Sequence, residues 1–153
     1  MNNKNMGLSS PLFNQQKGTH VCGESQAPPM NIVARDPAPT AADFRTLTHM
    51  ASAVDWNLSS IVPAKAKAVI LRVKLQDDTV GSYYAVFRHD VATDMCKLWT
   101  QAANAWTSQI MACPIGTDGI IMHQVFDANG SPAAVSNLSV TVVGWLEPMD
   151  GQP

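Results

Sequence analysis

The alternation of side chains between Val69 and Gln76 constrains the fold more than any other stretch of this chain. One face of this stretch holds Val69, Leu71, Val73 and Leu75, and the other holds Arg72, Lys74 and Gln76, with Ile70 as its one apolar member. A period of two is typical of a strand with one face on a core and the other toward water. The pattern therefore predicts a central strand within Ala66–Gln76, with its apolar set buried together.

Later segments repeat this pattern and are separated by short turns such as Asn129-Gly130. About seven strands are expected in the last hundred residues, over Ala53–Leu58, Ala66–Gln76, Ser82–Arg88, Met95–Thr100, Ala105–Cys113, Ile120–Phe126 and Leu138–Leu146. No strong helical period accompanies them. The sequence therefore predicts an all-β fold, an antiparallel β-sandwich that is jelly-roll-like.

The first part of the chain, Met1 to Pro39, has a different composition. It is rich in Asn, Gln, Ser and Gly and holds half of the ten prolines. Such a segment cannot close a core of its own, so we expect an extended N-terminal arm over residues 1–39 and a β-sandwich domain over 40–153. We expect the arm to be held against its own domain or a neighbouring subunit by apolar anchors, which are Leu12, Phe13, Met30, Ile32 and Val33.

Two interpretations of Thr40–Met50 stay open. Thr40 followed by Asp43 resembles a capping box, which favours a short helix or an irregular lead-in. The alternation of Arg45, Leu47 and His49 with threonines would also suit an edge strand. We favour the first interpretation.

The charge and hydropathy of the chain exclude some functions. Apolar residues make up 46% and charged residues only 14%, which suggests that part of the surface contacts other protein. The net charge is −2 and the lysines and arginines are scattered, which argues against nucleic acid as a partner. No apolar run has membrane-spanning length, and Met1–Ser10 lacks the apolar stretch of a signal peptide, so we expect synthesis in the cytoplasm.

The three cysteines allow at most one internal disulfide. Met95–Thr100 and Ala105–Cys113 are expected to form a hairpin, in which Cys96 and Cys113 could face each other. Free thiols packed as small apolar groups are the favoured interpretation in a reducing compartment. Cys22 follows Val21 and lies near His20, but an extended arm is a poor place to hold catalytic geometry.

No other set of residues predicts catalysis or metal binding. The four histidines, His20, His49, His89 and His123, are far apart and lie in no ligand spacing. The nearest approach to a cation site is the loop from His89 to Asp94, where turn capping is the favoured role. Asp77-Asp78 fall in a turn and are expected to be solvated rather than paired for glycoside hydrolysis. We therefore expect no enzyme, no cofactor and no metal.

Aromatic side chains are the remaining candidates for a binding surface. Trp106, Tyr83 and Tyr84 could stack on sugar rings if they were exposed on a sandwich. Aromatic residues in alternating strands more often belong to a core or a subunit contact, and that interpretation is favoured.

From Trp56 onward the chain resembles a β-sandwich module of tailed-bacteriophage virion proteins. The resemblance is carried by Trp56–Ala64, which leads directly into Ala68–Val73, and by Phe87-Arg88 and Val140–Trp145. It implies a structural virion protein without catalytic residues. The arm is outside the resemblance.

Two roles follow from this resemblance. The first is a capsid decoration (cement) protein that clamps neighbouring capsid subunits through its arm and oligomer contacts. Its partners would be the major capsid protein and copies of itself in a homotrimer, without nucleic acid or membrane. It would be made in the host cytoplasm and lie on the capsid surface. The alternative is a fibre or receptor-binding head domain that recognises host glycan.

Overall fold

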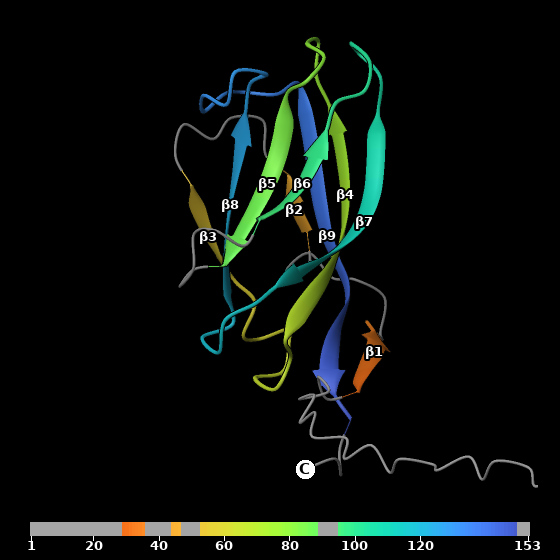
Figure 1. Ribbon diagram of the computed structural model, residues 1–153, viewed down its shortest axis with the longest axis vertical. Coiled ribbons are helices and arrows are strands. Elements are labelled where there is room, and N and C mark those ends of the chain that lie inside the picture. Colours follow the sequence, from red (N-terminus) through yellow and green to blue (C-terminus); the bar gives the residue numbers. More distant parts are fainter. Residues whose placement is uncertain (1–28, 36–43, 47–52, 89–94, 150–153) are drawn as a thin grey trace, which may run out of the picture.

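Two antiparallel β-sheets make up the fold (Figure 1). The computed structural model describes residues 29–35, 44–46, 53–88 and 95–149, and these contain nine strands and no helix. The predicted all-β sandwich is therefore confirmed. The jelly-roll topology and the extended arm stay predictions.

The first sheet is built around the longest strand, β9, which is Asn137–Pro148. Its strand order is β1-β9-β4-β7, and β2 also pairs with β9. The other members are β1 (Met30–Ala34), β2 (Phe44–Thr46), β4 (Ala68–Gln76) and β7 (Thr107–Pro114). β9 pairs with β4 along one edge, so β1 and β2 share its opposite edge, one after the other.

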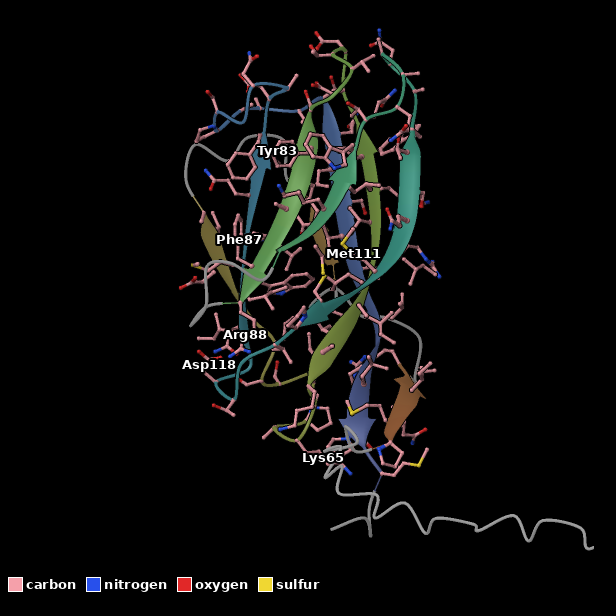
Figure 2. All side chains as sticks on the ribbon, viewed as in Figure 1. Lys65, Tyr83, Phe87, Arg88, Met111 and Asp118 are labelled. Carbon is pink, nitrogen blue, oxygen red and sulfur yellow. The ribbon has the colours of Figure 1, made fainter. Side chains whose placement is uncertain are left out.

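The second sheet has the order β3-β8-β5-β6. Its members are β3 (Val54–Asn57), β5 (Tyr83–Arg88), β6 (Met95–Trp99) and β8 (Ile120–Phe126). The side chains of Tyr84 and Val86 point from β5 into the space between the sheets, where they join the core. Tyr83 and Phe87 lie on the other face of the same strand (Figure 2).

The core confirms the predicted orientation of β4. Leu71 is fully buried together with its three alternate apolar neighbours on the strand, whereas Arg72 and Lys74 are exposed. Leu138, Val140 and Val142 of β9 contribute to the same core from the neighbouring strand. Burying each such side chain is worth about 1.5–3 kcal/mol, so the β4–β9 pair is the main source of core burial in this sheet.

The seven predicted strands are all present, but the predicted hairpin of Met95–Thr100 with Ala105–Cys113 is wrong. The two strands, β6 and β7, belong to different sheets, because β6 pairs with β5 and β7 pairs with β4. Residues 100–106 therefore connect one sheet to the other. The physical reason is that alternation shows which face of a strand is buried but not which strand lies beside it.

The helical interpretation of Thr40–Met50 is also wrong where that segment is described. Phe44–Thr46 is β2, which pairs with Ser139–Thr141 of β9, and the remainder of the segment lies outside the described residues. A free edge on β9 supplies the hydrogen bonds that a short helix would have to make locally. The edge-strand alternative is the one observed.

A β-bulge interrupts β9 where it passes from β2 to β1. Ile70 is opposite Gly144 and Leu71 is opposite Val142, which leaves Val143 as the extra residue. A bulge bends its strand and increases the local twist. This bend separates the part of β9 that carries β2 from the part that carries β1.

Candidate functional site

The arm residues expected to contact partners lie on β1 as far as the structure describes them. Ile32 is 70% exposed, Met30 is also exposed and Val33 is half-buried. Leu12 and Phe13 lie outside the described residues. The described anchors therefore sit on an edge strand of the first sheet, and two of them face solvent.

β1 is attached to β9 chiefly through its backbone. The Arg35 N–H donates to the carbonyl of Val143 at 2.9 Å, and the Met149 N–H donates to the carbonyl of Pro29 at 3.1 Å. These two bonds close the ladder at both ends. Since only Val33 of this strand is even partly buried, side-chain packing adds little to the attachment.

Gly144 makes the close approach of β1 possible. A Cβ atom added at this residue would overlap the backbone oxygen of Val33. The obstacle is backbone rather than the end of a flexible side chain, so β1 would have to move away. Gly144 is therefore part of the β1 binding edge, although it was not recognised as such in the sequence.

The second candidate surface is the outer face of the second sheet, where four rings form what we call the aromatic face: Tyr83, Phe87, Trp99 and Phe126. The Tyr83 ring centroid lies 4.1 Å from that of Trp99 and 4.9 Å from that of Phe126. Both neighbours are directly opposite Tyr83 in the two adjoining strands. The order of strands in the sheet thus lines up the rings across β6, β5 and β8.

A cation lies against this face. The Nζ atom of Lys97 is 5.0 Å from the Tyr83 ring centroid and 5.7 Å from that of Trp99, within the range of a cation–π interaction. Trp99 is 40% exposed, whereas Tyr83 is almost covered. The most accessible ring of the aromatic face is therefore the indole of Trp99, which lies beside an ammonium group and suits stacking on an apolar or sugar surface.

The three aromatic residues proposed from the sequence have different environments. Tyr83 belongs to the aromatic face, but Tyr84 is fully buried, with its hydroxyl 3.1 Å from Nδ1 of His123. Trp106 is 55% exposed and lies between β6 and β7. Sugar stacking by Tyr84 is thus excluded, since neighbouring residues on a strand point to opposite faces.

Sequence reasoning missed Lys97, Trp99 and Phe126 as members of one surface. The alternation that places Tyr83 and Phe87 on one side of β5 was visible in the sequence. The neighbours of these residues were not, because they depend on β6 and β8 flanking β5.

Asp77 was expected from the sequence to be solvated, but it is buried and joins the loops at one end of the sandwich. Its Oδ2 accepts a hydrogen bond of 2.6 Å from the hydroxyl of Ser82, and its Oδ1 accepts one of 3.3 Å from the N–H of Ser136. Its backbone carbonyl accepts a bond of 2.6 Å from the N–H of Asn104. The β4–β5, β6–β7 and β8–β9 loops meet at this end (Figure 1), so this residue has a structural role rather than a catalytic one.

Cys96 and Cys113 are not joined in a disulfide, and their thiols interact across the gap between the two sheets. The Cys96 thiol also donates to the carbonyl of Ala112 at 3.1 Å. The hydrogen bond with Cys96 and, second to it, burial raise the pKa of the Cys113 thiol far above its usual range. A thiol with a raised pKa is a poor nucleophile, which agrees with a packing role. Cys22 lies outside the described residues.

The remaining candidates give no convergent site among the residues that the structure describes. His123 is fully buried and stacks on Trp56 with ring centroids 5.9 Å apart, while the other three histidines lie in undescribed segments. Within the described ranges no three His, Cys, Asp or Glu side chains come together as metal ligands, and no pocket opens on the surface. The loop from His89 to Asp94 is outside these ranges.

No protein-family model matches the chain, and none of the curated proteins matches it either. Among the described residues, no helix is both long and apolar enough to cross a membrane.

Proposed function

We propose that this chain is a structural virion protein, a decoration (cement) protein that binds the major capsid protein and copies of itself at the capsid surface. The resemblance carried by Trp56–Ala64 and Val140–Trp145 supplies the virion context. In this proposal the protein is made in the host cytoplasm, assembles as a homotrimer and clamps neighbouring capsid subunits through its N-terminal arm.

The observation that carries the proposal is the attachment of β1. This strand is joined to β9 by backbone hydrogen bonds while Met30 and Ile32 face outward. Exposed apolar residues beside an open strand edge favour contact with another protein. An arm built in this way can bind the sandwich and a neighbouring surface at the same time.

The test compares the full chain with a chain that lacks residues 1–39, using phage shells stripped of the protein. We expect the truncated chain to keep its β-type dichroism spectrum, because β1 buries little, but to co-sediment with shells at least tenfold more weakly. A truncated chain that decorates shells as tightly as the full chain would overturn the clamp.

The aromatic face favours a second candidate, a fibre or receptor-binding head that recognises host glycan. Trp99 is its most accessible ring, so Trp99→Ala should abolish binding to host-cell glycan if this candidate is correct. The same substitution should leave attachment to shells unchanged. A micrograph of labelled particles separates the two, since a decoration protein covers the shell and a head domain lies on a fibre.

A further inference from the structure

The connection between β1 and β2 is much longer than the gap that it has to span. Both strands pair antiparallel with β9 on the same edge, with Arg35 bonded to Val143 and Phe44 opposite Thr141. The partners of the two strands are thus two residues apart on β9, a distance of about 7 Å. Residues 36–43 fill this gap with eight residues, and the nine steps from Arg35 to Phe44 can extend to about 30 Å.

The attachment of β1 is also one that any copy of β9 could provide. It rests on backbone bonds and on the room left at Gly144, and every copy of the chain has both. Because the residues of β9 are the same in every copy, β1 can make the same backbone bonds and the same partial burial of Val33 on its own β9 and on a neighbour's.

We infer that β1 is exchanged between copies, so that β1 of one chain pairs with β9 of a second copy of this chain. This inference rests on the proposed function, because it names the surface to which the arm attaches. Exchange keeps each of the backbone bonds and uses the surplus length of residues 36–43 to bridge two sandwiches.

The register of β1 on β9 identifies two residues between which a disulfide would report exchange. In an antiparallel ladder, hydrogen-bonded and non-hydrogen-bonded pairs alternate. Because Arg35 and Val143 form a hydrogen-bonded pair, Ile32 and Leu146, three positions further along, form a non-hydrogen-bonded pair. The Cα atoms of such a pair are about 4.5 Å apart, within the range that a disulfide bridges.

The experiment uses two full-length chains, one with Ile32→Cys and one with Leu146→Cys, mixed in urea, refolded together and oxidised. Exchange gives a covalent heterodimer containing about half of the chains, the share expected from random mixing of copies. Each chain refolded alone is the control for contacts through native cysteines. Peptide mapping identifies the bond between the two introduced thiols.

A heterodimer no more abundant than in the controls, from chains with the native β-type spectrum, would overturn the inference. The double variant, Ile32→Cys with Leu146→Cys, shows whether this disulfide can form at all. An intrachain bond shows pairing without exchange, and a covalent interchain oligomer supports exchange. The proposed function fails separately, in the shell co-sedimentation test, whatever the crosslinks show.

Discussion

At the scale of single residues, Asp77 shows how one buried carboxylate orders an end of the molecule. It accepts hydrogen bonds from two serines that lie on different loops, Ser82 and Ser136. Its neighbour Asp78 is exposed, and its Oδ1 accepts a hydrogen bond of 3.0 Å from the hydroxyl of the adjoining Thr79. The two acidic residues are adjacent in sequence but differ in burial and therefore in what their removal costs.

Asp77→Ala should lower the free energy of unfolding by about 1–3 kcal/mol, because the buried Ser82 hydroxyl loses its acceptor. Asp78→Ala is the matched control, with an expected change within about 0.5 kcal/mol, as for other surface substitutions. Urea unfolding measures both. Equal costs for the two variants would show that the carboxylate does not join the loops.

A second prediction at this scale concerns Cys113 and alkaline pH. The folded state holds the proton because the pKa of this thiol is raised, first by the hydrogen bond with Cys96 and then by burial. The unfolded chain loses the proton above about pH 8.5. Below that pH, ionisation of this thiol therefore does not lower the free energy of unfolding. Above it, the free energy of unfolding decreases by about 1.4 kcal/mol per pH unit.

Comparing the wild type with Cys113→Ala isolates this effect from other groups that titrate at high pH. Between about pH 8 and about pH 10, the wild type should lose about 2 kcal/mol more than the variant. Urea unfolding at the two pH values measures the difference. Parallel pH dependences would mean that this thiol ionises as easily in the folded protein as in the unfolded chain.

At the scale of elements, β4 connects the sequence pattern to the core. Leu71→Asp should prevent soluble folding, because an unpaired charge in the core costs several kcal/mol. Arg72→Asp, one residue further along and on the exposed face, is the matched control and should fold. Solubility and the β-type dichroism spectrum of each variant check the prediction, and a cooperative, soluble Leu71→Asp protein would contradict it.

The edge of β9 gives another prediction for an element. Gly144→Ala should release β1, because the added methyl group overlaps the Val33 carbonyl, while the rest of the sandwich stays folded. Amide hydrogen exchange over residues 30–35 should become at least tenfold faster. Ser108→Thr adds a methyl group on exposed β7 and serves as the control. Unchanged protection of residues 30–35 in the glycine variant would show that β1 tolerates the methyl group.

At the scale of the whole molecule, stability should not depend on a metal ion. The histidines are widely separated in the sequence and His123 is enclosed by core aromatic rings. Adding a chelator should leave the thermal midpoint unchanged, as followed by dichroism. A decrease of several degrees would contradict this prediction and make the loop from His89 to Asp94 the first candidate for a metal site.

Alternation along the sequence identified most of the strands and, for β4, the face that is buried. Alternation is a local property, because successive side chains of a strand point to opposite faces wherever the strand lies. It was sufficient for the buried face of β4 and for the seven strands from Val54 onward. Within the candidate site it separated Tyr83 from Tyr84 without showing which of the two was exposed.

Which strands are neighbours follows from the tertiary fold and not from any local pattern. Contacts between distant segments place β6 and β7 in different sheets and pair β1 and β2 with β9. They also align Trp99 with Tyr83 and Phe126. Such contacts form where an edge has free hydrogen-bonding groups, and the sequence of one strand carries little information about the edge that it meets. Gly144 has its role for the same reason, since the backbone that approaches it comes from residues more than a hundred positions earlier in the chain.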